Sequence, residues 1–284
     1  MDYASVASLI IFSVTLFLMI KRPRGMNLGV AAGIGAIASL LLGTVTVNDA
    51  FEAFKDIWDA ALAFVGIVTL SVTLDAMGFF KWAALKVVKI ARGDGVKLYF
   101  YISLLTALVS ILFANDSAVL ILTPIVLEIV SQLKIDDKGR LAYLFAAGLI
   151  ADTAAMLLIT SNPINIVSAD FFKYIFIEHL IFLGPAAIVT MLISLLVVYL
   201  FFRRQIPKSY SPTLVDALSN GSVITPMRLK ISVIALVAID VGYVAASLNR
   251  IPVSVIICSG AFSLLALYFV SPDNGASSKK EKAC

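Results

Sequence analysis

Apolar residues are gathered into long runs that are separated by short charged segments. Several runs approach the roughly 20 residues that a helix needs to cross the hydrocarbon layer of a membrane. Backbone groups in lipid must be hydrogen-bonded within the protein, so runs of this length are expected to be helices. The runs cover residues 3–20, 28–47, 59–80, 98–112, 117–133, 141–160, 179–202, 231–248 and 251–270. The pattern predicts an all-α polytopic membrane protein with about eight membrane segments, counting 98–112 and 117–133 as one.

Composition supports this class and argues against several functions. The 284 residues are 61% hydrophobic and 14% charged, against about 45–50% and roughly 25% in soluble domains. No G-x-x-x-x-G-K-[ST] sequence occurs, which excludes ATP hydrolysis by a P-loop. The two cysteines, Cys258 and Cys284, form neither a disulfide framework nor a thiolate metal site by themselves. With no nucleophile–base set or metal cluster in view, we expect a secondary transporter rather than an enzyme, without cofactor or nucleic-acid partner.

The basic residues fall in alternate loops. Nineteen of the 22 Lys and Arg residues lie in 21–24, 81–97, 134–140, the linker 203–230 and the tail 271–284. Loops rich in Lys and Arg stay in the cytoplasm. The chain is therefore expected to be a multi-pass protein of the cell (inner or plasma) membrane, with its N-terminus outside and its C-terminus in the cytoplasm. The 48–59 loop on the outer side is acidic.

The segment "KWAALKVVKIAR", residues 81–92, has the pattern of a basic amphipathic helix. Such a helix lies on the membrane surface with its apolar face in the lipid. A cytoplasmic extension of the preceding span fits the same pattern.

Asn115 and Asp116 interrupt an apolar stretch whose two arms, 98–112 and 117–133, are short. The arms correspond to roughly 22–26 Å of helix, against about 30 Å of hydrocarbon. Two short spans with an outer loop fit, and so does a re-entrant hairpin whose tip ends inside the membrane. In the second case the arm beginning at Asp116–Ser117 turns its positive dipole end towards the membrane centre, with Asn115 or Asp116 as its cap.

A second interruption lies in "LIADTAAMLLITSNPINIVSADFF". Asn162–Pro163 predicts a helix start, with Asn as N-cap and Pro at the first helical position. One helix therefore ends near Thr160–Ser161 and another begins. Discontinuous helices with polar breaks form the substrate sites of many transporters, although an outer loop after an ordinary span fits as well.

Acidic residues inside predicted spans are costly in lipid and are functional candidates. Asp116 and Asp152 rank first, because Asp152 lies about 18 Å past Arg140 along a helix and so near the midplane. The other acidic residues in the spans are Asp75, Glu128 and Asp240, and Glu128 is close enough in sequence to pair with Lys134. His179, the only histidine, is expected to be an interfacial residue rather than a ligand.

The stretches "FANDSAVLILTPIV" and "GLIADTAAMLLITSNPINIVSADFF" resemble the arsenite/antimonite efflux permeases of the ArsB type, in the ion transporter superfamily. They cover about 40 residues, and the order of spans is similar over roughly 1–205. The resemblance implies inverted repeats, each with scaffold helices, a re-entrant hairpin and a broken helix. Residues 1–202 would form the first repeat, with scaffold helices in 3–80, the hairpin at 98–133, the broken helix at 141–178 and a helix at 179–202. The cavity-lining positions implied are Asn115, Asp116, Ser117, Thr123, Ser161, Asn162 and Asn165.

The chain departs from this pattern after the 203–230 linker. Only two further spans follow, within 231–270, as scaffold helices of an incomplete second repeat, and a soluble tail occupies 271–284. The expectation is a chain truncated in its second repeat, which could need a second polypeptide to supply the rest.

Arsenite near neutral pH is mainly an uncharged trihydroxide, so its site needs hydrogen-bond donors and acceptors rather than a fixed positive charge. Asn, Ser, Thr and helix ends supply these groups. We expect extrusion of arsenite or antimonite, coupled to protons through Asp116 or Asp152 or driven with a separate cytoplasmic ATPase. A sodium/proton antiporter of the same superfamily is the first alternative, and a dicarboxylate carrier is disfavoured by the lack of Arg or Lys in either break. A non-transporting membrane fragment or assembly partner is an alternative of another class.

Overall fold

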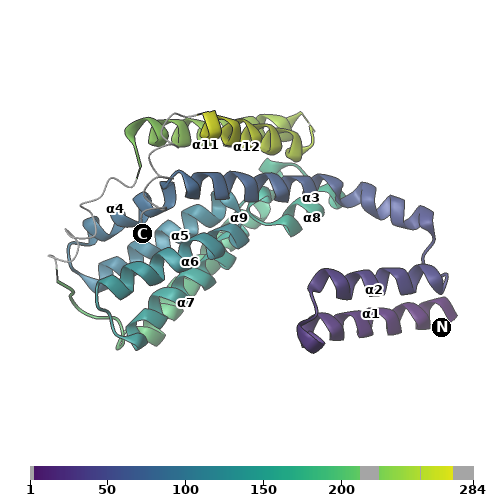
Figure 1. The fold of residues 1–284 in the computed structure, drawn as a ribbon, viewed down its shortest axis with the longest axis horizontal. Coiled ribbons are helices and arrows are strands. Elements are labelled where there is room, and N and C mark those ends of the chain that lie inside the picture. Colours follow the sequence, from purple (N-terminus) through teal and green to yellow (C-terminus); the bar gives the residue numbers. More distant parts are fainter. Residues whose placement is uncertain (1–2, 212–223, 250, 271–284) are drawn as a thin grey trace, which may run out of the picture. The chain divides into compact units, whose positions relative to one another are not determined.

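The computed structural model describes residues 3–211, 224–249 and 251–270. Part of the predicted linker (212–223) and the predicted soluble tail 271–284 lie outside these residues. Within them there are helices and turns but no β-strand, and six helices are long and apolar enough to cross a membrane, with a shorter apolar helix beside them. This confirms an all-α polytopic membrane protein. The chain divides into two compact units, 1–58 and 59–284, which are described separately (Figure 1).

The first unit contains a pair of helices, α1 (Tyr3–Lys21) and α2 (Leu28–Leu41), that pack side by side (Figure 1). The Thr15 side chain of α1 lies directly against Gly35 of α2, where any Cβ atom would clash. Asn27 caps α2, because its Oδ1 accepts a hydrogen bond from the Gly29 N–H at 3.0 Å. A small residue and a local cap therefore hold this pair together.

The third helix, α3 (Val47–Ala76), starts well before the apolar run 59–80. Thr46 and Asp49 form a reciprocal cap at its start. The Thr46 N–H donates to Asp49 Oδ2 at 2.8 Å, and the Asp49 N–H donates to Thr46 Oγ1 at 3.2 Å. Two free N–H groups are thereby satisfied. The expected acidic loop at 48–59 was wrong, since the cap starts the helix before this segment.

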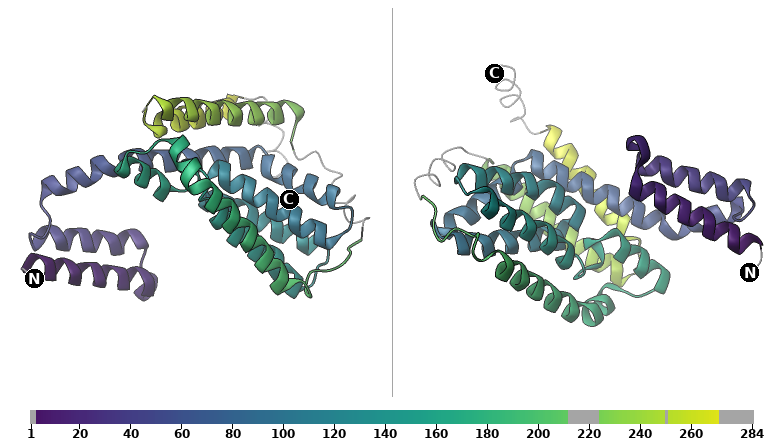
Figure 2. Two further views of the ribbon diagram at one scale, coloured as in Figure 1. Left: turned by 180° about the vertical axis from the view of Figure 1, so that it is seen from behind. Right: turned by 90° about the horizontal axis from the view of Figure 1, so that it is seen from below.

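In the second unit, four consecutive helices pack with one another and with α9 (Phe176–Phe202) (Figure 2). They are α4 (Phe79–Ala91), α5 (Gly95–Phe113), α6 (Asn115–Gln132) and α7 (Asp137–Ala154). Between α7 and α9 the chain forms a short 3-10 turn, η2 (Ile159–Ser161), and the helix α8 (Pro163–Phe172).

The basic segment 81–92 belongs to a separate helix, so its interpretation as an extension of the preceding span was wrong. Gly78 separates α3 from α4 with a φ of 86°, a conformation that glycine adopts at low cost. One face of α4 is buried, through Phe80, Ala84, Val88 and Ala91. Its lysines lie on the opposite, exposed face, as the amphipathic pattern predicted.

Three basic turns of the second unit meet at one end of the helices. The Gly95 N–H donates to the Lys208 carbonyl at 3.3 Å and the Tyr210 N–H to the Gly93 carbonyl at 2.8 Å. The Tyr143 hydroxyl donates to the Gly95 carbonyl at 2.9 Å. These bonds join the turns around 92–97 and 205–210 to α7, whose first residues lie within the basic segment 134–140. The charge pattern thus corresponds to one end of the folded unit.

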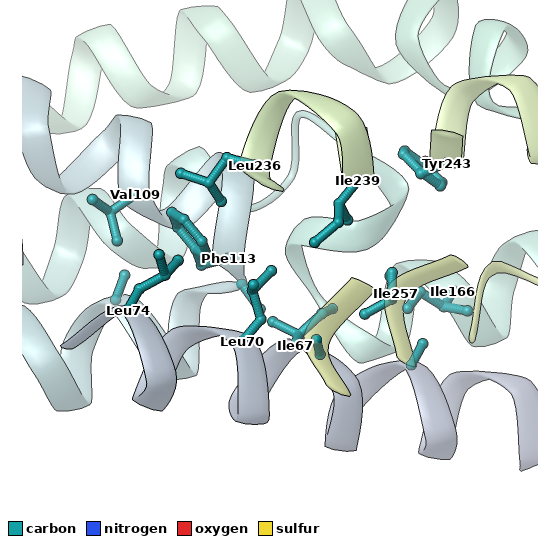
Figure 3. Packing of buried hydrophobic residues seen from close by; sticks show 14 of the residues in the cluster. Ile67, Leu70, Leu74, Val109, Phe113, Ile166, Leu236, Ile239, Tyr243 and Ile257 are labelled. Atoms are coloured by element: carbon teal, nitrogen blue, oxygen red, sulfur yellow. The ribbon is translucent and has the colours of Figure 1, made fainter. Parts of the chain in front are cut away.

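The last two helices, α11 (Pro226–Leu248) and α12 (Val253–Val270), pack against the second half of α3. Figure 3 shows Leu236 and Ile239 of α11 beside Ile67 and Leu70 of α3. Gly66 allows close approach, because a Cβ there would lie 2.8 Å from Ile257 Cγ2. This contact joins the end of the described chain to the helices that precede the hairpin.

Candidate functional site at the hairpin tip

The chain reverses direction at the hairpin tip through a single residue. α5 ends at Phe113 and α6 begins at Asn115, with Ala114 alone between them at φ 70° and ψ 149°. This is a conformation that is essentially restricted to glycine, and an alanine there stores backbone strain. Phe113 and Ala114 are 1% and 0% exposed. The turn residue itself is therefore enclosed by protein, while Asp116 beside it is exposed.

Two details of the expected hairpin were wrong. Its arms have 19 and 18 residues rather than the 15 and 17 counted from the sequence, or roughly 27–29 Å of helix. α6 begins at Asn115, and its N-cap is Ala114, which makes no side-chain capping bond. The turn at Ala114 places Asn115 in the first helical turn, so it does not occupy the N-cap position.

Asn115 instead connects the hairpin to α7. Its Nδ2 donates to Asp152 Oδ1 at 3.1 Å, over 37 positions of sequence. The other amide oxygen, Asn115 Oδ1, is buried and has no hydrogen-bond partner among the described residues. Asp116 and Asp152 are both exposed. The tip therefore brings together the Asp152 carboxylate, the unpaired Asn115 amide oxygen and the first N–H groups of α6, which has no side-chain cap.

The segment between α7 and α8, which interrupts the predicted span, lies against the end of α5. The Ser161 hydroxyl donates to the Ile111 carbonyl at 2.6 Å, and the Ser110 hydroxyl donates to the Ala151 carbonyl. The Asn165 amide donates to the carbonyls of Ala155 at 2.9 Å and of Leu158 at 3.0 Å. Carbonyl groups freed where a helix ends need such partners. The polar residues of the break thus fix the ends of the two helices to each other.

Asn162–Pro163 starts α8 as predicted. Asn162 Oδ1 accepts from the Ile164 N–H at 3.0 Å, and Pro163 occupies the first helical position. The preceding helix, however, ends at Ala154 and not near Thr160–Ser161. The segment between them forms a turn, because its carbonyl groups bond to Asn165.

The remaining candidates lie farther along the helices. Ser117 is 4% exposed, and Thr123 is half-buried about two turns along α6, which continues through Pro124. Glu128 pairs with Lys81 of α4 at 3.0 Å rather than with Lys134. The structure thus joins Asn115 to Asp152, while Ser161 and Asn165 bond to backbone carbonyls near the ends of α5 and α7.

Sequence reasoning missed the role of His179. It is 3% exposed, its Nε2 lies 3.1 Å from the Met156 carbonyl oxygen, and its ring stacks on that of Tyr174 with 5.7 Å between the ring centroids. It therefore bonds to a carbonyl just past the end of α7. A single histidine beside the break was the available signal, but only the fold shows its partner.

The position of the tip along α9 can be compared with that helix's length. Ile111, near the end of α5, and Met191 of α9 pack against one cluster that is formed by Ala107, Ile150 and Ala154. The stretches 176–191 and 191–202 of α9 correspond to roughly 22 Å and 17 Å of helix. The last turn of α5 thus packs near the middle of α9.

These features define a polytopic helical membrane protein in which a hairpin tip meets an interrupted helix. Comparison with known proteins gives the family. A family model described as "Arsenical pump membrane protein" (ArsB) matches residues 7–282. The chain is 39% identical over 257 residues to an arsenical pump membrane protein of Escherichia coli and 40% identical over 257 residues to that of Yersinia enterocolitica, covering 90% of this chain in each case. A putative arsenical pump membrane protein of Bacillus subtilis is 28% identical over 198 residues, which are 70% of this chain and 45% of that protein.

The chain belongs to the ArsB family of arsenical pump membrane proteins. It spans about 60% of the length of the Escherichia coli and Yersinia relatives.

Proposed function

We propose that the chain takes part in extruding arsenite or antimonite, with the substrate bound at the hairpin tip. The observation that carries this proposal is the Asn115–Asp152 contact beside the uncapped start of α6. An uncharged trihydroxide both donates and accepts hydrogen bonds. Asp152 and Asn115 Oδ1 supply acceptors, and the first N–H groups of α6 supply donors.

The other candidate residues have supporting roles in this proposal. Ser117 and Thr123 line the path along α6, and Ser161, Asn162 and Asn165 line the side formed by the break. Cys258 and Cys284 are too few for tight trithiolate capture. Weak, reversible polar binding is what a carrier needs, because the substrate must also leave.

Energy coupling is proposed to run through protons on Asp116 or Asp152. Both carboxylates lie at the tip, where a proton could be exchanged as the substrate is released. A separate cytoplasmic ATPase is the other proposed energy source. A proton uncoupler would stop the first mechanism in vesicles without ATP and leave the second unchanged in vesicles supplied with ATP and the ATPase.

The hairpin is proposed to be re-entrant, with its tip inside the membrane. Support comes from the packing of Ile111, one turn before the tip, near the middle of α9 and from the burial of Ala114. Residues 1–202 would form the first repeat, 203–230 a linker, and α11 and α12 scaffold helices of a second repeat. We further propose that the basic turns face the cytoplasm, with the N-terminus outside the cell membrane.

The direct test is arsenite uptake into everted membrane vesicles from a host without its own arsenic exporter. Asp152→Asn and Asn115→Ala are expected to lower uptake about tenfold or more, because each removes a hydrogen-bonding group from the site. Asp75→Asn is the matched control, since it removes an exposed carboxylate at the end of α3, and it is expected to stay within about twofold of the parent. Uptake by the intact chain no higher than in empty vesicles overturns the proposal for this chain.

Accessibility labelling tests the depth of the tip. Asn115→Cys in a chain with Cys258→Ser and Cys284→Ser is expected to resist a membrane-impermeant maleimide added outside whole cells. Lys173→Cys, exposed in the turn before α9, serves as the labelled outer control. Labelling at 115 as fast as at the Lys173→Cys control contradicts a tip inside the membrane.

The same two carboxylates favour one second candidate, a sodium/proton antiporter. Asp116 and Asp152 would then bind Na⁺ with nearby carbonyl oxygens. Sodium-dependent proton movement in the same vesicles, unaffected by arsenite and lost in Asp152→Asn, would replace the first proposal with this one.

A further inference from the structure

A basic hollow lies far from the hairpin tip, at the other end of α5. It has a volume of about 540 Å³ and is lined by four cationic side chains together with Ile90 and Tyr101. The cations are Lys86, Lys89, Arg92 and Lys97. Lys86 and Lys89 come from the exposed face of α4, and Lys97 comes from the first turn of α5. Two helices and their connecting turn thus surround one concentration of positive charge.

Most of this charge is not neutralised by the part of the chain that the structure describes. The Lys97 Nζ lies 3.6 Å from Asp94 Oδ2, so this cation has a carboxylate partner. No described carboxylate forms an ion pair with Lys86, Lys89 or Arg92. The Lys86 ammonium instead lies 5.9 Å from the ring centroid of Trp82, a cation–π contact that leaves its positive charge in place. The hollow is therefore suited to a ligand that carries negative charge.

The turn that shapes the hollow is held from outside. Arg92 ends α4 in a left-handed conformation with φ of 50°. The neighbouring Gly93 carbonyl accepts the Tyr210 N–H at 2.8 Å, and the Tyr210 hydroxyl donates to the Val88 carbonyl at 3.3 Å. These bonds fix the angle between α4 and α5, so the cationic side chains project from a preformed frame.

An exposed apolar strip leads away from the hollow along α5. Lys97, Tyr101, Leu104 and Leu108 follow one another at four-, three- and four-residue spacing, which places them on one face of a helix. Leu104 is 64% exposed and Leu108 is 53% exposed. Ile90, beside the hollow on α4, is 57% exposed. A charged end and an apolar strip are thus continuous on one surface.

We propose that this surface binds an anionic phospholipid, with its phosphate head group in the hollow and an acyl chain along Tyr101, Leu104 and Leu108. Basic pockets at the membrane interface recognise anionic head groups. A soluble anion would contact only the cations, whereas a lipid would also cover the apolar strip. α5 and α9 are long and apolar enough to lie in the membrane, which places the strip among acyl chains. An acidic protein would engage the cations but would leave the strip in lipid, so the lipid fits more of the surface.

Trp82 offers a local probe. The chain has two tryptophans, so Trp58→Phe leaves Trp82 alone, next to Lys86. The chain is reconstituted in mixed vesicles in which either phosphatidylglycerol or phosphatidylcholine carries brominated acyl chains. Quenching of Trp82 then reports which lipid occupies the site. We expect a preference for phosphatidylglycerol of about tenfold, because several cations each contribute to anionic lipid binding.

The decisive variant is Lys86→Gln/Lys89→Gln/Arg92→Gln, which should reduce the preference to about that of the bulk lipid. The matched control, Lys138→Gln/Arg203→Gln/Arg204→Gln, removes three exposed cations from the same end of the unit and should keep the preference. Lys86→Arg/Lys89→Arg/Arg92→Lys, which conserves charge, should keep it too, and helicity by circular dichroism shows that all variants fold.

Three results overturn the proposal. The first is a preference that the control triple variant loses as fully as the pocket triple variant. The second is a preference that millimolar inorganic phosphate abolishes, which would assign the hollow to a free anion. The third is no lipid preference together with pocket-dependent binding of poly-glutamate, which would indicate an acidic protein partner.

Discussion

Two helix starts in the second unit are built in opposite ways. At α12, Asp59 from the distant helix α3 accepts the Val253 N–H at 3.1 Å and the Ser254 N–H at 2.9 Å, and its side chain is 6% exposed. At α6, Ala114 provides no capping side chain, and Asn115 points to Asp152. Both helix starts carry free N–H groups and a positive dipole end. The protein fills one with its own carboxylate and leaves the other open, so the first holds helices together and the second is available to a ligand.

The largest effect that tests this comparison is expected for Asp59→Ala. It leaves two N–H groups unsatisfied, one buried and one part-buried, and is expected to cost about 3 kcal/mol in the docking of α12. Cys258, half-buried on α12 with its Sγ 3.2 Å from the Leu62 carbonyl, reports that docking. In a Cys284→Ser background its maleimide reaction is expected to accelerate about a hundredfold.

Asp116→Ala is the matched control for that experiment. Its carboxylate is exposed in the first turn of the uncapped helix, so the Cys258 reaction rate is expected to stay unchanged. Equal rates in the parent chain and the Asp59→Ala variant would show that the carboxylate does not hold α12.

The next effect concerns the turn that keeps the α6 start open. Ala114→Val places a β-branched residue at positive φ in a site with no free space, and we expect a loss of about 2 kcal/mol in unfolding free energy. Ala114→Gly relieves the backbone strain and is expected to gain about 0.5–1 kcal/mol, less the entropy cost of glycine. Thermal unfolding of the detergent-purified chain measures both. A destabilising glycine would mean that the turn is not strained.

A smaller effect is expected for Ser161→Ala, which removes the bond from the break to the Ile111 carbonyl. One buried hydrogen bond contributes about 1 kcal/mol. Ser259→Ala is the control, because its hydroxyl bonds the Ile256 carbonyl within its own exposed helix turn, and its effect is expected within about 0.5 kcal/mol. Equal shifts of the unfolding temperature in both variants would show that the Ser161–Ile111 bond contributes no more stability than the local Ser259 bond.

The smallest effect is expected at a third kind of helix start, the water-facing cap of α5. The Asp94 carboxylate accepts the Lys97 N–H at 3.0 Å, and this bond is the main cause that lowers the pKa of Asp94. A lowered pKa means that the stabilisation is complete above the unfolded value near 3.9 and is lost as pH falls through the folded value. The unfolding temperature of Asp94→Asn should therefore fall less between pH 5 and pH 3 than that of the parent. Parallel pH profiles would contradict this cap.

Helix starts also separate what could be predicted from the sequence from what could not. Asn162–Pro163 was predicted correctly, because its N-cap bond spans two residues and depends on local chain geometry alone. The Thr46–Asp49 cap is equally local, and overlooking it led to the wrong loop at 48–59. Asn115 carried the same kind of local signal, but its side chain bonds to Asp152, 37 residues away, instead of capping the helix. A strong cap residue predicts a helix start only where no tertiary contact competes for it.

The sequence by itself determined the membrane class, the helical content, the positions of the two interruptions and the resemblance to the arsenical pumps. These follow from long apolar runs and local polar residues, whose physical consequences hold in any fold. Only the tertiary structure decided that Asn115 meets Asp152, that Asp59 caps α12, that His179 bonds near the end of α7, and that four cations surround one hollow. Such contacts join residues far apart in the chain, and their partners are chosen by how the helices pack.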